Sequence, residues 1–363
     1  MKPVIVDENI PFLPEILRQK YEVITFSGRE LTREKILAAE AETLFVRSTI
    51  KANADLLGGT GVKFIVTATA GDDHFDKDFM HENGIYFSNA AGSNSNSVAE
   101  YAVYAILTAY EKRNRSPRGE TIGIVGFGNI GSKLAHYCHA LGMHVLVNDP
   151  PLRAAGATFP DYCEYAELGE LIENSDVVSN HVPRIRSGEY CTMNLFNAEN
   201  LRRLKSSGVF IHASRGGVAN ETALGEFLAK NSAADLIIDV YADEPQPNEA
   251  LALRAIIATP HVAGHAFNGK LLGTLMVLQA YKDFSGATFD ESLIEANSRQ
   301  SDFNGTMPSE EILLAKIAEY RNISSDIATF RRLFTLEQAM QPAEFDRERR
   351  YYPVRYEYLK IIK

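Results

Sequence analysis

The sequence predicts an α/β protein made of two Rossmann-like lobes, each built on a doubly wound parallel sheet, followed by a small C-terminal α+β domain. Two series of short β-rich runs predict the lobes, because a helical pattern separates each run from the next. Beyond about residue 290 this alternation stops, and polar, tyrosine-rich helical sequence follows. The change of pattern predicts the third, smaller part.

The first series of predicted strands precedes a long helical pattern that begins at Ser97. Its runs are rich in valine, isoleucine and phenylalanine, which is typical of strands buried in a parallel sheet. They read "PVIV", "EVITF", "TLFVRS", "KFIVTAT" and "GIYFSNA". The pattern "SVAEYAVYAILTAYEKR" then predicts one long helix, from Ser97 to Arg113, that passes between the two lobes.

The second series of strands begins at Thr121 and shows the same alternation. Helical patterns such as 168–173 and 222–230 separate its runs. The runs read "TIGIVG", "HVLVND", "DVVSNHV", "GVFIHAS", "LIIDVY" and "AIIATPH". This series predicts the second parallel sheet.

The composition is that of an ordinary globular protein, with 45% hydrophobic and 23% charged residues in a chain of 363. Its net charge of -10 argues against nucleic acid or an anionic membrane as partner, because both need a broad basic surface. Cys138, Cys163 and Cys191 lack paired spacing, so we expect neither disulfides nor a metal site. No apolar run is long enough to span a bilayer, and we expect a cytoplasmic protein.

A glycine-rich segment, "TIGIVGFGNIG", places Gly126, Gly128 and Gly131 in the pattern G-x-G-x-x-G. The pattern alone is common, but here a strand precedes it, a helix follows it, and the next strand ends in Asp149. In such a unit the glycines let the backbone approach a pyrophosphate, and the acid accepts hydrogen bonds from the adenosine ribose. We therefore expect NAD as the cofactor, because the carboxylate of Asp149 would repel the additional phosphate of NADP. Arg153 lies nearby in the sequence, however, so NADP is left open as an alternative cofactor.

Three further segments each end a predicted strand and carry one reactive side chain: "HASRGGV" has Arg215, "DVYADEP" has Glu244 and "ATPHVAGH" has His261. Ligands of open α/β sheets gather at the carboxyl ends of strands, so these side chains could meet in one cleft. His261 would accept the proton of a substrate hydroxyl, Glu244 would orient His261, and Arg215 would bind a substrate carboxylate. Each has an ordinary structural explanation by itself, and only the joint placement favours catalysis of hydride transfer.

The order and spacing of these motifs resemble those of the D-isomer-specific 2-hydroxyacid dehydrogenases over most of the chain. The resemblance implies that Arg215 binds the substrate carboxylate, that His261 is the acid–base residue and that Glu244 is its partner. It also implies that the segment after His261 completes the first lobe. The domains are then a substrate-binding lobe (1–95 with 265–289), an NAD-binding lobe (96–264) and a C-terminal domain (290–363).

Within that family, "VDENIP", "TATAGDDHFD", "NDPP" and above all "PAEFDRERRYY" are similar to a branch that oxidises a phosphorylated hydroxy acid in vitamin B6 biosynthesis. The C-terminal extension of that branch is a dimerisation domain, so the resemblance implies a homodimer. Ser48 and Thr69 are the implied substrate contacts, and His265 stands where that branch usually has a substrate-contacting tyrosine. The other implied NAD contacts are Asn129, Ile130, Val182, Ala213, Ser214, Asp239 and Gly264.

A substrate with both a carboxylate and a phosphate needs locally concentrated cations on this acidic chain. Arg215 can serve only the carboxylate. For the phosphate our hypothesis is Arg47, together with one arginine of the tail, from the same or the partner subunit: Arg347, Arg349 or Arg350. The alternative is that the tail arginines form a solvated helix face with ion pairs.

Two other functions are left open by the sequence. One is a dehydrogenase of another 2-hydroxy acid, such as 3-phosphoglycerate; the tail disfavours it, because the pattern of the regulatory domain usual in such enzymes is missing after Asp290. The other is a non-catalytic protein that senses NADH, which would bind the cofactor without turnover. Turnover of any 2-hydroxy acid distinguishes an enzyme from a sensor.

Overall fold

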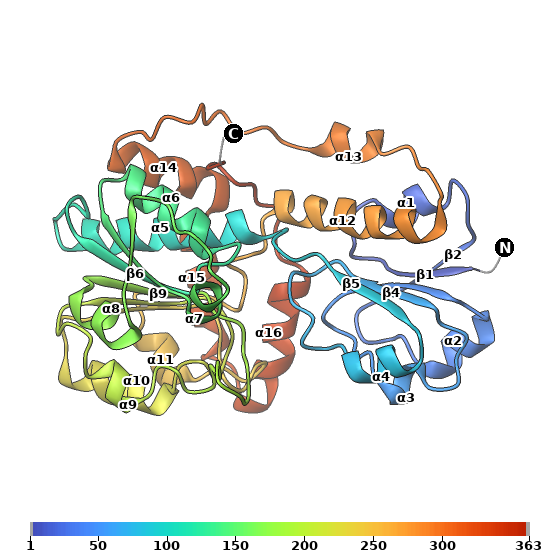
Figure 1. The fold of residues 1–363 in the computed structure, drawn as a ribbon, viewed down its shortest axis with the longest axis horizontal. Coiled ribbons are helices and arrows are strands. Elements are labelled where there is room, and N and C mark those ends of the chain that lie inside the picture. Colours follow the sequence, from blue (N-terminus) through green and yellow to red (C-terminus); the bar gives the residue numbers. More distant parts are fainter. Residues whose placement is uncertain (1–2, 361–363) are drawn as a thin grey trace. The chain divides into compact units, whose positions relative to one another are not determined.

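The computed structural model describes residues 3–360, and the chain forms two compact units, each with one parallel sheet (Figure 1). Unit 1 contains the chain up to Asn94 and residues 266–300, and unit 2 contains residues 95–265 and the chain from Ser301 onward. The chain therefore passes between the units three times, after Asn94, after His265 and after Gln300. Two parallel α/β sheets confirm the predicted fold class for both lobes.

The sheet of unit 1 has five strands in the order β2-β1-β3-β4-β5, all parallel. Each strand coincides with one of the five predicted runs. The carboxyl ends of the neighbouring strands β3 and β4 lead into the segments that carry Arg47, Ser48 and Thr69. The strands are β1 (Val4–Asp7), β2 (Val23–Phe26), β3 (Thr43–Val46), β4 (Phe64–Thr67) and β5 (Tyr86–Asn89).

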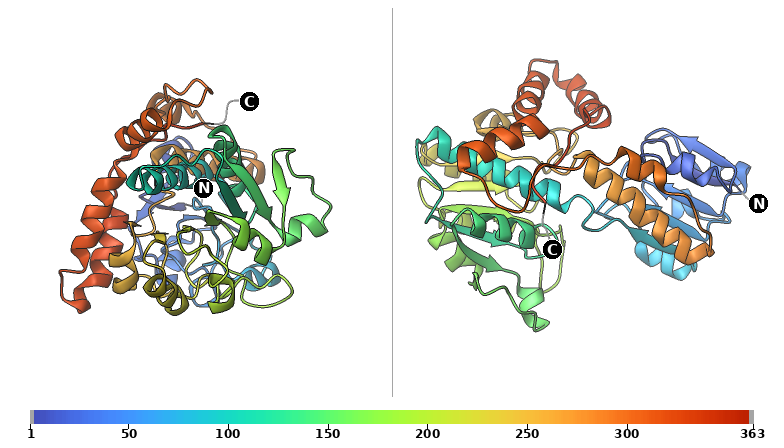
Figure 2. Two further views of the ribbon diagram at one scale, coloured as in Figure 1. Left: turned by 90° about the vertical axis from the view of Figure 1, so that its left-hand side faces the viewer. Right: turned by 90° about the horizontal axis from the view of Figure 1, so that it is seen from above.

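Helices cover both faces of this sheet, as a doubly wound unit requires (Figures 1 and 2). The three central strands β1, β3 and β4 are buried throughout and mostly apolar, whereas the edge strands β2 and β5 are partly exposed. One face packs against α1 (Leu13–Leu17), α12 (Phe267–Ser285) and α13 (Ser292–Asn297). The other packs against α2 (Arg33–Ala39), α3 (Ala54–Leu57) and α4 (Lys77–Glu82).

The sheet of unit 2 has seven parallel strands in the order β12-β11-β10-β9-β6-β7-β8. The order reverses between β6 and β9, and such a switch point opens a crevice for ligands at the carboxyl ends of the strands. The three-residue edge strand β8 was not predicted. The strands are β6 (Thr121–Val125), β7 (His144–Asn148), β8 (Cys163–Tyr165), β9 (Val177–Asn180), β10 (Val209–His212), β11 (Asp235–Ile238) and β12 (Ile257–Ala258).

Two apolar clusters hold helices against the faces of this sheet. The predicted long helix is α5, which starts at the first residue of unit 2 and belongs wholly to it. One face of the sheet packs against α5 (Ser95–Lys112), α6 (Gly131–Ala140) and α14 (Glu310–Arg321). The opposite face has α8 (Leu168–Asn174), α9 (Ala198–Leu201), α10 (Glu221–Lys230), α11 (Glu249–Arg254), α15 (Ile323–Leu333) and α16 (Gln341–Arg350), while α7 (Pro150–Ala154) and the 3-10 helix η1 (Gln338–Met340) are short connections.

The C-terminal part is helical, so the predicted α+β character was wrong. Beyond β12 the structure has no strand up to residue 360, the last one that it describes. The extended run after Tyr351 does not pair as a strand, because the N–H groups of Tyr358 and Leu359 donate to the carboxylate of Glu100. Residues 301–360 group with unit 2 rather than forming a compact unit of their own.

Within residues 3–360, every helix is too short or too polar to cross a lipid bilayer.

Candidate active site

The glycine loop forms a tight turn between β6 and α6 in unit 2. Gly126 has φ +91°, and a Cβ there would lie 2.9 Å from the backbone of His181. A Cβ on Gly131 would lie 2.0 Å from the carbonyl oxygen of Gly126, whereas none of the described atoms lies within 4 Å of a Cβ built on Gly128. Gly126 and Gly131 therefore close the turn, and Gly128 leaves room beside the backbone.

This turn suits the pyrophosphate of a dinucleotide. No described side chain caps the first N–H groups of α6, where Ile130 is the N-cap residue, and Asn129 lies just before it. Uncapped N–H groups at a helix N-terminus favour an anion. The structure therefore has the features that NAD requires at this position.

Asp149, at the end of β7, is fixed by two backbone groups. Its Oδ2 accepts the N–H of Phe127 at 2.8 Å, and its Oδ1 accepts the N–H of Leu152 at 3.0 Å as the N-cap of α7. The exposed guanidinium of Arg153 forms an ion pair with Glu167 at 2.9 Å and lies over the ring of Tyr165. The carboxylate thus lies beside the glycine loop, as the dinucleotide prediction requires.

His261 and Glu244 form the central polar contact of unit 2. Nδ1 of His261 lies 2.8 Å from Oε2 of Glu244, and Oε1 of Glu244 accepts the N–H of Tyr241 at 3.0 Å. Burial raises the pKa of Glu244, but the charge and hydrogen bond of His261 and the charge of Arg349 lower it. The net result is a pKa of about 2. An ionised carboxylate only accepts hydrogen bonds, so Nδ1 carries the proton and Nε2 is left to exchange a proton with a substrate.

The loop after β12 (residues 259–265, hereafter the β12 loop) holds His261 in a left-handed conformation, with φ +58°. Asp239, buried at the end of β11, organises this loop: Oδ1 accepts from Thr259 at 2.6 Å and from the N–H of Val262 at 2.8 Å, and Oδ2 accepts the N–H of Ala263 at 3.0 Å. Burial raises the pKa of Asp239 to about 6. Asp239 therefore has a structural role in this loop, and its contact to NAD stays a prediction.

Arg215 follows β10, the strand next to β11. Its Nη1 donates to the carbonyl of Ser214 at 2.9 Å. A Cβ on Gly216 would lie 1.9 Å from the carbonyl oxygen of Tyr241, so the Arg215 segment packs directly on the backbone that holds Glu244. The structure thus places Arg215, Glu244 and His261 at the carboxyl ends of three adjacent strands.

The remaining expected NAD contacts surround the same strand ends. Val182 lies against Gly126, and Ser214 accepts a hydrogen bond from Asn180 at 2.8 Å, which joins the ends of β9 and β10. Ala213 precedes Ser214 and is buried, and Gly264 lies in the β12 loop. These contacts to NAD stay predictions.

A buried histidine that the sequence did not single out lies beside the His261–Glu244 pair. His212 ends β10, and its Nδ1 accepts from the side-chain amide of Asn180 at 3.1 Å. Burial lowers the pKa of His212 to about 4, against the opposing charge of Glu244. His212 is therefore neutral at physiological pH and adds no competing cation.

The expected substrate contacts Arg47, Ser48 and Thr69 lie in unit 1. Ser48 is exposed, and the hydroxyl of Thr69 bonds that of Thr67 at 2.7 Å and donates to the carbonyl of Gly71. Arg47 is close enough to Lys270, in the first turn of α12, that its charge adds to burial in lowering the pKa of Lys270 to about 8. Lys270 was missed, because nothing in its local sequence indicates that it interacts with Arg47.

The C-terminal helix α16 brings one arginine to the acid–base pair. Phe345 packs against Tyr241, and Arg349, one turn later, stacks over Phe345 and lowers the pKa of Glu244. Arg347 instead pairs with Glu344 on its own helix, which matches the alternative of a helix face with ion pairs. The ring of His265 packs edge-on against Tyr352 at 5.5 Å.

The lowered pKa of Glu244 predicts a pH-dependent contribution to stability. The pKa is lower in the folded chain than its ordinary 4.5, so ionised Glu244 stabilises the fold fully above pH 4.5 and loses that effect as the pH falls toward 2. The difference in free energy of unfolding between wild type and Glu244→Gln should therefore be constant near neutral pH and shrink below pH 4.5. Urea unfolding from pH 7 to pH 3 measures it, with Glu226→Gln on α10 as control. A difference that does not change with pH would contradict the pKa assignment.

Comparison with known proteins places this geometry in a family. Residues 99–263 match the profile of the "D-isomer specific 2-hydroxyacid dehydrogenase, NAD binding domain", which includes the glycine loop and the β12 loop as far as Ala263. The fold is similar to that of a D-lactate dehydrogenase from Aquifex aeolicus complexed with NAD and lactic acid, with a TM-score of 0.66 and 25% identity over 81% of this chain and 98% of that one. These findings confirm the predicted NAD-binding domain.

Two curated relatives have higher sequence identity to this chain. The erythronate-4-phosphate dehydrogenase of Salmonella arizonae is 40% identical over 78% of this chain and 73% of its own. That of Proteus mirabilis is 35% identical over 99% of this chain and 93% of its own, so the likeness includes the C-terminal segment. The chain therefore belongs to the erythronate-4-phosphate dehydrogenase family, within the D-isomer-specific 2-hydroxyacid dehydrogenases.

Proposed function

We propose that this protein uses NAD to oxidise 4-phospho-D-erythronate to (R)-3-hydroxy-2-oxo-4-phosphobutanoate, a step of pyridoxal 5'-phosphate biosynthesis. The relatives supply the substrate class, and the 2.8 Å hydrogen bond between His261 and Glu244 is the observation that supports the chemistry. A sensor of NADH has no need for an acid–base pair at the carboxyl end of the sheet.

His261 acts as the general base in this proposal. With its Nδ1 proton held by ionised Glu244, its Nε2 accepts the proton of the C2 hydroxyl, and Glu244 stabilises the imidazolium that forms. When bound, the nicotinamide takes the hydride from the same carbon. Arg215 binds the substrate carboxylate and thereby orients the C2 hydroxyl toward His261.

The residues that would hold NAD are those of the glycine loop and the adjacent strand ends. The N-terminus of α6 and the backbone of Gly128 would bind the pyrophosphate, and Asp149 would accept hydrogen bonds from the ribose. The ion pair of Arg153 with Glu167 supports NAD over NADP, because that arginine already has a carboxylate partner.

For the substrate phosphate we propose Arg47 together with Lys270. Both lie in unit 1, and the charge of Arg47 contributes to the lowered pKa of Lys270, so the two cations interact electrostatically. A phosphate dianion would be attracted to both. This proposal replaces a tail arginine by Lys270 as the partner of Arg47.

Replacing Arg47 with alanine should raise KM for 4-phosphoerythronate by about 10- to 100-fold, as loss of one charge-assisted hydrogen bond predicts. KM for unphosphorylated erythronate should change little. Initial rates with both acids measure the ratio, and Lys63→Ala, which removes an exposed cation from the same unit, serves as control. Equal effects of Arg47→Ala on both acids would rule out a phosphate contact.

Two further expectations belong to this proposal. A cytoplasmic homodimer joined through the C-terminal segment, with a small phosphorylated acid and no nucleic acid as partner, is what the sequence resemblance implies. Sedimentation of the purified protein at several concentrations tests the dimer.

A further inference from the structure

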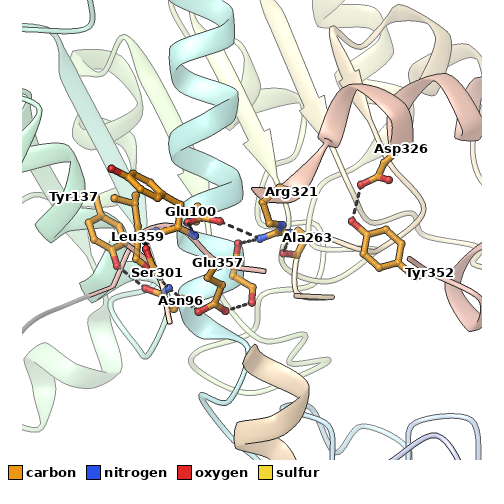
Figure 3. A network of polar contacts seen from close by, with 12 residues as sticks. Asn96, Glu100, Tyr137, Ala263, Ser301, Arg321, Asp326, Tyr352, Glu357 and Leu359 are labelled. Atoms are coloured by element: carbon orange, nitrogen blue, oxygen red, sulfur yellow. Dashed lines mark hydrogen bonds and ion pairs between the residues drawn. The ribbon is translucent and has the colours of Figure 1, made fainter. Parts of the chain in front are cut away.

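Arg321 is a fully buried arginine at the end of α14, and its guanidinium joins two segments of unit 2 (Figure 3). Nη1 donates to the carbonyl oxygen of Ser97 at 2.9 Å, and Nη2 donates to that of Ala263 at 2.8 Å. Its side chain is 0% exposed. Burial of a guanidinium costs several kcal/mol unless it is paired and hydrogen-bonded, so this arrangement needs compensation from its surroundings.

Glu100 on α5 supplies the compensating charge. Its carboxylate is also 0% exposed and lies 3.7 Å from Nη1 of Arg321. Oε2 accepts the N–H groups of Tyr358 and Leu359 at 2.7 and 2.5 Å. Burial raises the pKa of Glu100, whereas the charge of Arg321 and these two N–H groups lower it and favour the ionised carboxylate. The extended tail thus closes over a buried ion pair.

The start of α5 fixes the tail from the other side. The side-chain amide of Asn96 donates to the carboxylate of Glu357 at 2.9 Å and to the carbonyl of Leu359 at 2.6 Å, and the hydroxyl of Ser97 also donates to Glu357. The hydroxyl of Tyr137, on α6, donates to Asn96. Arg321 is therefore anchored in a polar network that includes α5, α6 and the tail (Figure 3).

At its other end Arg321 holds the β12 loop. The N–H of Ala263 donates to Asp239, and the carbonyl of Ala263 accepts from Arg321, so both peptide groups of this residue are fixed. His261, two residues earlier, has φ +58°. A left-handed conformation is strained for a residue other than glycine, and it persists only where the surroundings determine it. Asp239 and Arg321 both hold this loop next to His261.

We propose that Arg321 is a positioning residue for His261. By holding the carbonyl of Ala263 against the rigid start of α5, it keeps the β12 loop in the conformation in which Nδ1 of His261 meets Glu244. The inference rests on the dehydrogenase function proposed above and extends it, because it makes the C-terminal segment part of the machinery that aligns the acid–base pair. That role is separate from any role of the segment in dimerisation.

Two variants test the proposal. Arg321→Lys keeps a charge opposite Glu100, but a single ammonium cannot bridge the two carbonyls as a guanidinium does. The double variant Arg321→Met with Glu100→Gln removes both charges, so that neither is left buried and unpaired. Arg331→Met is the matched control, because Arg331 comes from the same C-terminal segment and donates to the carbonyl of Ala255 at 3.0 Å.

In both Arg321 variants kcat should fall by about 10- to 100-fold, as a displaced catalytic group predicts, while KM for the hydroxy acid and the Kd of NADH change by about twofold or less. Hydrogen exchange of the Val262 and Ala263 amides, both bonded to Asp239, should become faster. Arg331→Met should keep wild-type kcat and wild-type exchange in this loop.

Unchanged kcat and unchanged loop exchange in folded Arg321 variants would overturn the proposal. So would an equal loss of kcat in Arg331→Met, since that would reflect general destabilisation. If the double variant does not fold, Arg321→Lys decides, because it keeps the buried ion pair. If the wild type oxidises no hydroxy acid, the proposed function fails, whereas loop exchange in the same variants still decides whether Arg321 positions the β12 loop.

Discussion

Replacing His261 with asparagine should lower kcat by about 10²- to 10⁴-fold, the usual contribution of a positioned general base. The structure explains the size of the effect: Nδ1 is committed to Glu244, so Nε2 is the atom of this residue that accepts the substrate proton. An asparagine amide fits the same space but cannot take up a proton at neutral pH. Initial rates of NAD reduction measure the loss.

The Kd of NADH should change little in this variant, because the glycine loop and Asp149 lie at other strand ends. His144→Asn is the matched control, since His144 is exposed at the amino end of β7, the opposite edge of the same sheet. A variant at position 261 that keeps more than a tenth of wild-type kcat would show that another group is the base.

Replacing Arg215 with lysine should lower kcat/KM by about 10- to 100-fold, because at least one of two hydrogen bonds to a charged group, at about 1.5–3 kcal/mol each, is lost. A lysine keeps the charge but loses the planar fork that binds a carboxylate in a fixed orientation. Because that orientation brings the C2 hydroxyl to His261, the variant should have both a lower kcat and a higher KM for the hydroxy acid. Steady-state kinetics with the hydroxy acid varied measures both.

Arg254→Lys controls for the general effect of this substitution in unit 2. Nη2 of Arg254 donates to the backbone carbonyls of Ser232 and Ala234, so this guanidinium is also held by two hydrogen bonds, but at the last residue of α11. Wild-type kcat/KM in Arg215→Lys, or an equal loss in Arg254→Lys, would contradict a specific role of Arg215 in substrate binding.

The sheets could be predicted from the sequence mainly because their central strands are buried on both faces. The run "FIVT" of β4, for example, is wholly buried, and such a run has few alternatives to a parallel strand. The edge strand β8 reads "CEY" and is half exposed, so it carries no such pattern. The tail was predicted partly as strand, but its extended run is held by the side chain of Glu100 rather than by a neighbouring strand.

The candidate site could be predicted where strand order alone brings residues together. Arg215, Glu244 and His261 each follow a strand of one parallel sheet, and the ends of β10, β11 and β12 are neighbours. Arg321 could not be found this way, because it meets Ser97 and Ala263 across 224 and 58 residues of sequence. In the sequence it is only a charged residue at the end of a polar helix, where arginines are common.

For the same reason Lys270 was missed, and Arg349 was left undecided as one of three tail arginines. Their effects on other groups depend on how α12 packs on the sheet of unit 1 and how α16 packs on Tyr241 in unit 2. Hydrophobic periodicity predicts that a helix has a buried face, but not which strand end its charged residues reach.

The initial rate of NAD reduction with 4-phosphoerythronate tests the central claim most directly. It is run beside 3-phosphoglycerate and unphosphorylated erythronate, with hydrazine present to trap the oxo product, because oxidation of a hydroxy acid is uphill at neutral pH. The account predicts a rate with 4-phosphoerythronate that greatly exceeds those with the other two acids. No rate with 4-phosphoerythronate, in protein shown to bind NADH, would contradict it.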